Sequence, residues 1–550
     1  MLLTSFDKER FEEFTRAGFW CNDTIYSLVA AHARDAAAKI AILSSHNALS
    51  YKALLDAADA LADDLAHRGL TAGDRVAVWL PNRIAGAVAL VACSRNGYVC
   101  CPSLHRDHTA AEVATLVKRM RAACFIGQTG YGADADETDI FSLLAEVDSL
   151  KCSYRLGESQ GALHEGIVGP RRLQRNSNPA PADPNRVLYL AFTSGTTGEP
   201  KGVMHSDNTL LASARALSRD WNISSTSVIY SLSPLSHNLG FGALIMTLLV
   251  GGELVLHDLA RGGSIVDRVI ETGTTFLVGG PTHAIDILSE LKARKLRGLG
   301  RLEGFRISGA STSSAIIYDL LSYGITPQSG YGMTETCSHQ YTLPNDDPQL
   351  IAETCGRACA GYEVRIFERD NPDQEARPGE IGQIGGRGAC LMLGYFDNQI
   401  ATEASFNRDG WFLTGDMGWI DANGYLRVTG RKKDVIIRGG HNINPAKIEA
   451  LASQYDAIES AAAVPVPDDR LGEKVCLAVV FRSDKHGTPD EILEHLHQAG
   501  LSKFDMPEYF LPLKEMPQTA SGKPRKRDIV EWIAEGRLHP VPVRWMSRKA

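Results

Sequence analysis

Apolar and polar residues alternate along most of the chain with the periods of helices and strands. A helix is expected to begin after Ser50, a good N-cap residue, with four apolar residues on one face: Leu54, Ala58, Leu61 and Leu65. A β-branched run at 75–82 then predicts a strand, and a helix over 85–93 and an apolar strand at 98–101 follow it. Strands separated by helices of this length predict parallel sheets that are covered by helices on both faces.

The same rhythm continues at 275–280, 304–308 and 325–329, where short apolar runs predict further strands. The composition of the sequence changes at 431–433, where the basic cluster RKK follows a region rich in glycine and aspartate. We therefore expect two domains, a large one over residues 1–430 and a small α/β unit over 431–550.

The composition is that of a globular protein with more than one core. The chain has 550 residues, of which 44% are hydrophobic and 22% charged, and its formal net charge is −8. This mild acidity argues against a nucleic-acid or membrane-surface binder, because such proteins normally present a basic face. Eleven scattered cysteines without a CxxC pair indicate neither a disulfide framework nor a zinc site.

No segment of the sequence has the pattern of a signal peptide or a membrane-spanning helix. The first twenty residues lack the apolar centre of a signal peptide. The longest apolar run, at 241–250, is far shorter than the roughly 20 residues that a spanning helix needs. We therefore expect a cytoplasmic protein.

The decapeptide TSGTTGEPKG at 193–202 concentrates glycines, hydroxyl side chains and one lysine in a single loop. A strand is expected before it at 186–192 and an apolar segment after it at 202–206, so the loop joins two strands, whereas a Walker A loop requires strand, loop and helix. Glycines let the backbone approach a ligand, and hydroxyls and lysine can bind phosphate oxygens; a flexible surface turn is the alternative. The candidate phosphate-binding residues are Thr193, Ser194, Gly195, Thr196, Thr197, Gly198 and Lys201.

Four further motifs follow this loop in a fixed order. They are YGMTET at 331–336, LTGD at 413–416, GRKKDVIIRGG at 430–440 and SGKPRK at 521–526. With TSGTTGEPKG they resemble the motif set of the adenylate-forming superfamily, which includes acyl- and aryl-CoA synthetases, nonribosomal peptide synthetase adenylation domains and firefly-type luciferases. The resemblance implies an α/β fold, with a large N-terminal domain of α/β-layered sheets, a β-barrel-like subdomain and a small mobile C-terminal α+β domain.

The resemblance also implies a nucleotide site. Tyr331 would stack on adenine, Thr334 would bind the α-phosphate, and Glu335 would hold Mg²⁺, for which a carboxylate is a suitable ligand. Asp416 would accept hydrogen bonds from both ribose hydroxyls, and Arg431 would lie near the ribose. The other residues carried over to this site are Gly309, Ala310, Ser311, Ser329, Gly330, Gly332 and Met333.

Catalysis is expected to depend most on Lys523, which the resemblance places across the domain interface between the substrate carboxylate and the α-phosphate. Positive charge at this point would lower the repulsion between two anions. The catalytic set that the resemblance implies is Lys523, Thr334, Glu335 and His237.

The second half-reaction needs a thiol to reach the acyl carbon, so the small domain would swing about a hinge at Lys433. The loop Gly439, Gly440 and His441 would then contact CoA. The chain departs from the family at His441 and at Lys447, which replaces a common acidic position, and this leaves the thiol acceptor less defined.

The acid pocket is expected around the stretch LSPLSHNLGFG at 232–242. No acidic residue stands where amino-acid-activating domains bind a substrate amino group, and the expected wall is apolar and rich in glycine. The overall pattern is most similar to cyclohexanecarboxylate-type CoA ligases, so a cyclic, aromatic or medium-chain acid is expected. The candidate wall residues are His237, Asn238, Leu239, Phe241, Gly280, Gly309, Gly330 and Cys337.

The main hypothesis is an ATP- and Mg²⁺-dependent ligase that forms an acyl-AMP and then an acyl-CoA thioester. One alternative is an acyl-AMP ligase that passes its acid to a carrier protein in trans or to a partner synthetase. Another is a nucleotide-binding regulator without catalysis, although the intact motif residues argue against it. A homodimer is left open, and neither nucleic acid nor membrane is expected as a partner.

Overall fold

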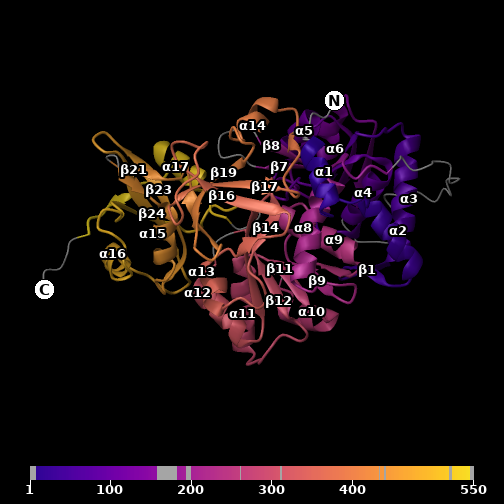
Figure 1. The fold of residues 1–550 in the computed structure, drawn as a ribbon. Helices are drawn as coiled ribbons and strands as arrows, with labels where there is room; N and C mark the ends of the chain where they lie inside the picture. Colours follow the sequence, from indigo (N-terminus) through magenta and orange to yellow (C-terminus); the bar gives the residue numbers. More distant parts are fainter. Residues whose placement is uncertain are drawn as a thin grey trace. The chain divides into compact units, whose positions relative to one another are not determined.

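The computed structural model describes residues 8–157, 182–193, 200–260, 262–309, 312–432, 434–438, 441–519 and 523–545 (Figure 1). Packing divides the chain into two compact units. The first unit contains residues 1–364 and 386–412, and the second contains 365–385 and 413–550. The expected domain boundary at residue 430 stays a prediction.

The first unit contains a sheet of nine strands in the order β15-β14-β13-β12-β11-β9-β10-β1-β2. The strands from β1 to β13 in this order pair in parallel, and antiparallel partners extend the sheet at both ends. Their bounds are β1 (Ile40–Leu43), β2 (Ala48–Ser50), β9 (Val228–Ser231), β10 (Glu253–Leu256), β11 (Phe276–Gly279), β12 (Gly304–Ile307), β13 (Thr326–Met333), β14 (Cys337–Tyr341) and β15 (Arg357–Ala358).

A second sheet of the first unit has seven strands in the order β18-β8-β7-β4-β3-β5-β6. Strands β6, β5, β3, β4 and β7 run parallel, β8 pairs antiparallel with β7, and β18 pairs antiparallel with β8. Their bounds are β3 (Arg75–Trp79), β4 (Val99–Cys101), β5 (Ala122–Gln128), β6 (Cys152–Leu156), β7 (Val187–Thr193), β8 (Lys201–Ser206) and β18 (Gly394–Tyr395).

Helices cover both faces of both sheets, as the alternation of strands and helices predicts. The largest apolar cluster joins the two sheets through α2 (Ile25–Asp35), α3 (Tyr51–His67), α4 (Ile84–Asn96), α8 (Asp207–Asp220) and α9 (Asn238–Val250). The outer face of the seven-stranded sheet carries α5 (Ala110–Arg119) and α6 (Ile140–Leu143), which continues into a 3₁₀ turn (Leu144–Glu146). The outer face of the nine-stranded sheet carries α10 (Ile265–Thr272), α11 (Pro281–Ala293), α12 (Ser314–Ser322) and α13 (Pro348–Glu353).

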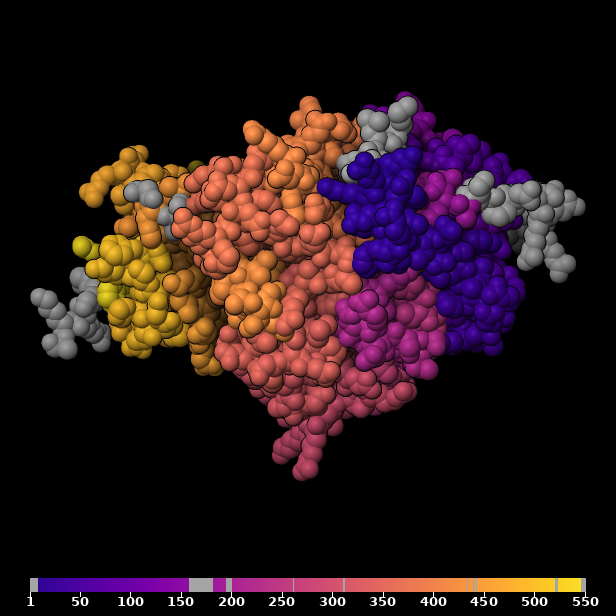
Figure 2. Space-filling view, viewed as in Figure 1, coloured from indigo at the N-terminus to yellow at the C-terminus, as the bar shows by residue number. Residues whose placement is uncertain are grey.

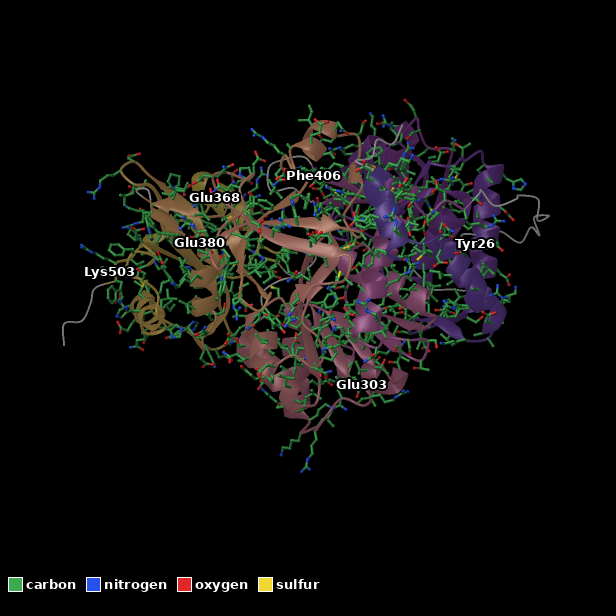
Figure 3. The ribbon with its side chains drawn as sticks, in the orientation of Figure 1. Tyr26, Glu303, Glu368, Glu380, Phe406 and Lys503 are labelled. Carbon is green, nitrogen blue, oxygen red and sulfur yellow. The ribbon has the colours of Figure 1, made fainter. Side chains whose placement is uncertain are left out.

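Local sequence signals account for several of these element boundaries. Ser50 caps α3 by accepting a hydrogen bond from the backbone N–H of Ala53, and the four apolar residues predicted on one face of this helix are buried. Strand β3 ends at Trp79, earlier than the predicted range, because Pro81 has no N–H for a ladder hydrogen bond. Helix α2 contacts α3 through Tyr26, whose hydroxyl donates to Asp59 at 2.9 Å (Figure 3).

The N-terminal segment lies on the surface of the first unit beside α8 (Figure 2). This segment includes α1 (Lys8–Arg16). The first unit also contains a short helix near its other end in the chain, α14 (Gln399–Glu403). The backbone N–H of Cys21 donates to Asn208 at 2.9 Å, and the indole N–H of Trp20 donates to the carbonyl of Ala389 at 2.8 Å. The first contact ties the start of the described chain to α8, the helix that follows the glycine-rich loop, and the second ties it to the segment after β17.

A further sheet, most of whose residues belong to the second unit, has the order β16-β17-β19-β20. Its strands are β16 (Tyr362–Phe367), β17 (Gly382–Gly388), β19 (Phe412–Ile420) and β20 (Leu426–Arg431). Its first strand follows β15 of the nine-stranded sheet in the chain, and its last strand precedes the C-terminal sheet.

The C-terminal sheet has the order β22-β21-β24-β25-β26, with β23 also paired to β24. Its strands are β21 (Ile436–Arg438), β22 (His441–Ile443), β23 (Ile458–Asp468), β24 (Gly472–Phe481), β25 (Tyr509–Pro512) and β26 (Val541–Pro542). The helices α15 (Pro445–Ala452), α16 (Pro489–Gln498) and α17 (Lys526–Ala534) pack on it around two apolar clusters. In the described part of the chain, no helix is long and apolar enough to cross a membrane.

Candidate active site

The glycine-rich loop joins two paired antiparallel strands, as its sequence context predicts. Thr193 at the end of β7 lies opposite Lys201 at the start of β8, and its hydroxyl donates to the Lys201 carbonyl at 3.4 Å. Helix α8 begins only at Asp207, so the strand–loop–helix arrangement of a Walker A site is absent from these residues. Five of the predicted phosphate-binding residues lie outside the described residues: Ser194, Gly195, Thr196, Thr197 and Gly198.

Tyr395 connects Lys201 with the predicted magnesium ligand Glu335. The Lys201 ammonium lies 4.6 Å from the centre of the Tyr395 ring, and the Tyr395 hydroxyl donates to Glu335 Oε1 at 2.9 Å. Burial raises the pKa of Tyr395, and the carboxylate of Glu335 raises it further, so the phenol stays a donor. The sequence does not mark Tyr395, because it meets this site only through the pairing of β18 with β8.

The carboxylate of Glu335 is chemically suited to Mg²⁺. It is a buried oxygen ligand of the kind this cation prefers. The residue is held at its backbone as well as by Tyr395, because the backbone carbonyl of Glu335 accepts a hydrogen bond from the N–H of Met392 at 2.7 Å.

The backbone at Thr334 is held by a buried histidine that the sequence also does not mark. His205 Nε2 lies 2.7 Å from the Thr334 carbonyl, which can only accept, so Nε2 carries the proton. Burial lowers the pKa of His205 to about 4, which keeps the ring neutral at physiological pH. Its Nδ1 is 3.0 Å from the hydroxyl of Thr209 on α8. The predicted α-phosphate residue is therefore tied to the helix that follows the glycine-rich loop.

The other described residues predicted to bind the nucleotide in the first unit lie just after β12 and in the second half of β13. These parallel strands are neighbours, and ligands of α/β sheets commonly bind at such carboxyl ends. Gly309 follows β12 with a φ of 100°, and the Tyr331 ring lies edge-on to His339 at 5.5 Å. A Cβ on Gly332 would come within 2.1 Å of the Cys337 carbonyl, so this position near the end of β13 requires glycine. All the predicted residues from Ser329 to Met333 belong to β13, whereas Ala310 and Ser311 lie outside the described residues.

A cavity lies between α8, α9 and the inner face of the nine-stranded sheet. Three of the predicted pocket residues, Asn238, Leu239 and Cys337, line it. Helix α9 begins at Asn238, as predicted, because His237 caps it by accepting a hydrogen bond from the Leu239 N–H at 3.3 Å. The other lining residues are Leu210, Ser213, Ala214, Leu217, Gly242, Ala243, Ile245, Met246, Val278, Arg306 and Ser338.

The remaining predicted wall residues are not part of this lining, and their contact with an acid stays a prediction. Phe241 points into the core, where its ring stacks on Tyr189 with centroids 4.3 Å apart. His237 lies beside His105, with ring centroids 6.4 Å apart. The others are Gly280, Gly309 and Gly330.

In the second unit, the predicted ribose residues are partners in one strand pair. Asp416 on β19 lies opposite Arg431 on β20, and Arg431 Nε donates to Asp416 Oδ1 at 3.1 Å. Gly415 precedes this aspartate with a φ of 77°, a conformation that favours glycine. The carboxylate is buried on the inner strand β19, while the guanidinium on the edge strand β20 stays exposed.

Lys523 lies in a loop closed by reciprocal contacts with Thr519. The Thr519 N–H donates to the Lys523 carbonyl at 2.8 Å, and the Lys523 N–H donates to the Thr519 hydroxyl at 3.2 Å. The pKa of Lys523 is lowered, mainly by desolvation and further by the positive charge of Arg431, while the negative charge of Asp416 acts in the opposite direction. The side chain still contacts solvent. The predicted catalytic lysine is thus within electrostatic reach of the ribose pair.

The predicted hinge and CoA loop are only partly described. Lys433, Gly439 and Gly440 lie outside the described residues. Lys432, next to the hinge, donates to the Arg369 carbonyl at 2.7 Å. His441 Nε2 lies 2.8 Å from a carboxylate oxygen of Asp505, and its side chain is exposed.

Comparison with known proteins extends these observations to the whole chain. A family model described as AMP-binding enzyme matches residues 29–396, and one described as AMP-binding enzyme C-terminal domain matches 447–523. A medium-chain fatty-acid–CoA ligase of Escherichia coli (strain K12) is 28% identical over 542 residues, which cover 96% of this chain and 95% of the relative. A 3-[(3aS,4S,7aS)-7a-methyl-1,5-dioxo-octahydro-1H-inden-4-yl]propanoyl:CoA ligase of Mycobacterium tuberculosis (strain ATCC 25618 / H37Rv) is 30% identical over 513 residues, covering 89% and 95%.

Solved structures agree with this comparison. ATP-bound MatB from Rhodopseudomonas palustris has a TM-score of 0.81 and 25% identity, and the match covers 92% of this chain and 99% of that one. The anthranilate CoA ligase AuaEII in complex with anthranoyl-AMP has a TM-score of 0.83 at 19% identity, covering 93% and 98%, and so supports the fold alone. The α/β fold with a large N-terminal and a small C-terminal domain is thereby confirmed.

Proposed function

Because the chain belongs to the AMP-binding enzyme family and is an AMP-forming carboxylic acid–CoA ligase, we propose that its acid has a bulky, largely apolar body. The enzyme uses ATP, Mg²⁺ and CoA. It first forms an acyl adenylate with release of pyrophosphate, and then an acyl-CoA thioester with release of AMP.

The kind of acid that the enzyme activates is inferred from the lining of the cavity between α8 and α9. Apart from a few polar groups, apolar and small side chains line it, and such walls favour a cyclic, aromatic or medium-chain body. The printed names of two relatives agree, since one acts on medium-chain fatty acids and the other forms the CoA derivative of a fused-ring propanoate.

In the first half-reaction, a carboxylate oxygen of the acid attacks the α-phosphorus, and the bond from that phosphorus to pyrophosphate breaks. The loop from Thr193 to Lys201 holds the β- and γ-phosphates, Thr334 binds the α-phosphate and Tyr331 stacks on adenine. Glu335 would hold Mg²⁺, which would supply positive charge to the leaving pyrophosphate. The rigid placement of Glu335 and Thr334 by Tyr395 and His205 supports these roles, because preorganised charges stabilise a transition state best.

Asp416, Arg431 and Lys523 act on the same nucleotide in this proposal. The ionised carboxylate of Asp416 only accepts hydrogen bonds, which suits the two ribose hydroxyls, and Arg431 holds it in place. Lys523 contacts both the acid carboxylate and the α-phosphate. Its positive charge lowers the repulsion between these two anions as they approach.

In the second half-reaction, the CoA thiol attacks the acyl carbon and the bond to AMP breaks. We propose that the C-terminal domain moves about Lys433 between the two steps, and that Gly439, Gly440 and His441 line the path of the thiol. A carrier protein in trans carries the same thiol group and is a second candidate acceptor, since the loop at His441 departs from the family pattern. We place the enzyme in the cytoplasm, where ATP and CoA are available, and leave a homodimer as a question for sedimentation.

One experiment tests the acid and the acceptor together. Acid-dependent ATP–pyrophosphate exchange is measured over a panel of cyclic, aromatic, medium-chain and short acids, and thioester formation is then measured with CoA. We expect exchange and thioester with the bulky members. Exchange without thioester would favour a carrier protein, and exchange only with short acids would contradict the proposed acid class.

A further inference from the structure

Arg306 is a buried cation in the lining of the acid cavity. It lies on β12, where successive side chains point to opposite faces of the sheet. Phe305 and Ile307 pack into the apolar cluster under α10, α11 and α12, whereas Arg306 faces the cavity beneath α8 and α9. Only 3% of its surface is exposed, so the guanidinium has left bulk water.

The hydrogen bonding of Arg306 is incomplete for a buried guanidinium. One nitrogen, Nη1, donates to Gln328 Oε1 at 2.6 Å, and Gln328 occupies the paired position on the neighbouring strand β13. No carboxylate among the described residues forms an ion pair with Arg306. The Gln328 Nε2 is itself buried and has no hydrogen-bond partner in the described part of the chain.

A second buried arginine is neutralised by two carboxylates and provides a comparison. Arg95 on α4 is 8% exposed, and it pairs with Asp63 at 2.8 Å and with Asp59 at 3.0 Å. Arg306 is buried at least as deeply and has only a neutral amide. Burial lowers the pKa of Arg306 to about 10, so it remains charged at neutral pH. A buried cation without a counter-charge is costly, and that cost is offset if a ligand supplies the missing acceptor.

We propose that Arg306 recognises a second oxygen group on the acid, a carbonyl or carboxylate remote from the carboxylate that is activated. The inference rests on the proposed function and narrows its substrate class. The apolar residues of α8 and α9 would contact the carbon skeleton, and Arg306 on the sheet would bind the remote oxygen. A guanidinium is suited to this because its N–H groups form a planar fork that matches a carboxylate and can also donate to a carbonyl.

Pairs of acids with one skeleton and different remote oxygens test this proposal. One series is cyclohexanecarboxylate, 4-oxocyclohexanecarboxylate and trans-1,4-cyclohexanedicarboxylate; the other is octanoate and octanedioate. In ATP–pyrophosphate exchange, we expect at least one oxygenated acid to exceed its unsubstituted partner in kcat/KM by about tenfold or more. The ketone and the dicarboxylates separate a neutral acceptor from an anionic one.

The variant Arg306→Met is expected to lose this preference and to favour the unsubstituted acids. Arg306→Lys keeps the charge and should retain part of the preference. The matched control is Arg268→Met, which removes a largely buried guanidinium from α10 on the opposite face of the same sheet and should leave the preference unchanged. Thermal unfolding of all variants separates misfolding from altered recognition.

A wild-type preference for the unsubstituted acids, or an unchanged preference in a folded Arg306→Met, would overturn the proposal. Equal exchange rates with the oxygenated and the unsubstituted acids would contradict this inference alone. If no acid in the panel supports exchange, the proposed function itself is contradicted. In that second case, calorimetric binding of the same acids decides the matter. Binding of an oxygenated acid that is tenfold tighter in wild type than in Arg306→Met supports the inference, and equal or absent binding overturns it.

Discussion

Tyr395 donates a 2.9 Å hydrogen bond to Glu335 while its ring lies 4.6 Å from the ammonium of Lys201. One side chain on β18 therefore sets the spacing between a cation from the glycine-rich loop region and the carboxylate proposed to hold Mg²⁺. Neither contact depends on neighbouring sequence, because Lys201 and Tyr395 meet through the pairing of β8 with β18, whereas Glu335 comes from the turn between β13 and β14.

Tyr395→Phe removes the hydrogen bond to Glu335 but keeps the ring near Lys201. We expect acid-dependent exchange to fall about tenfold and the Mg²⁺ concentration for half-maximal rate to rise, because the carboxylate loses its fixed orientation. A magnesium titration of the exchange reaction measures both effects. The control is Tyr26→Phe, which removes a phenol–carboxylate hydrogen bond of the same length between α2 and α3 (Figure 3). Equal magnesium dependence in both variants would contradict a role for Tyr395 at the metal.

Lys523→Ala should lose exchange by at least about a hundredfold, or 2.7 kcal/mol of barrier. The reason is that two anions would then meet without the positive charge proposed to bridge them. Thioester formation from a supplied acyl adenylate should fall much less, because pyrophosphate has already left. The exposed Lys503, labelled in Figure 3, provides the control Lys503→Ala. Near-normal exchange in Lys523→Ala would refute the proposed role.

We expect Asp207 at the start of α8 to make the free energy of unfolding depend on pH. Its buried carboxylate accepts from the Ile25 N–H at 2.7 Å and from the Ser94 hydroxyl at 3.3 Å, and burial raises its pKa to about 7. The fold thus holds this proton more tightly than the unfolded chain, whose aspartates titrate near about 4. This contribution therefore falls as the pH rises from about 4 to about 7.

Urea unfolding at pH 5.5 and pH 8 measures that effect. The wild type should lose more stability between these values than Asp207→Asn, which keeps the Oδ1 acceptor but cannot ionise. Identical losses in the two proteins would show that Asp207 does not titrate in this range.

Gly242→Ala tests whether the cavity between α8 and α9 holds the acid. A Cβ at this α9 position would meet no atom within 4 Å, so the variant should fold and gain up to about 1 kcal/mol from helix propensity. Because Gly242 lines the cavity, KM for the bulkiest acids should rise several-fold while KM for ATP stays constant. Gly240→Ala is the contrast, since its Cβ would come within 2.2 Å of the Pro234 carbonyl and should destabilise the fold. Unchanged KM values in Gly242→Ala would show that the acid does not bind in this cavity.

Local signals in the sequence predicted the scaffold better than the site. The cap at Ser50 and the alternation of apolar residues act over a few positions, so they locate α3 and the strands on either side of the glycine-rich loop. His205, Arg306 and Tyr395 could not be predicted, because their partners lie more than twenty residues away in the sequence and no local pattern distinguishes these three residues. The roles carried over from the family, including the hinge at Lys433, stay predictions for experiment.

Because successive side chains of β12 point to opposite faces of the sheet, one strand serves both the packing of the outer helices and the lining of the cavity. Phe305 and Ile307 serve the packing of the outer helices, while Arg306 between them faces the cavity. A library at position 306 could therefore change which acids the enzyme accepts while the flanking core residues stay as they are. In evolution, the same separation would let a ligase of this kind explore new acids through single substitutions that spare its nucleotide chemistry.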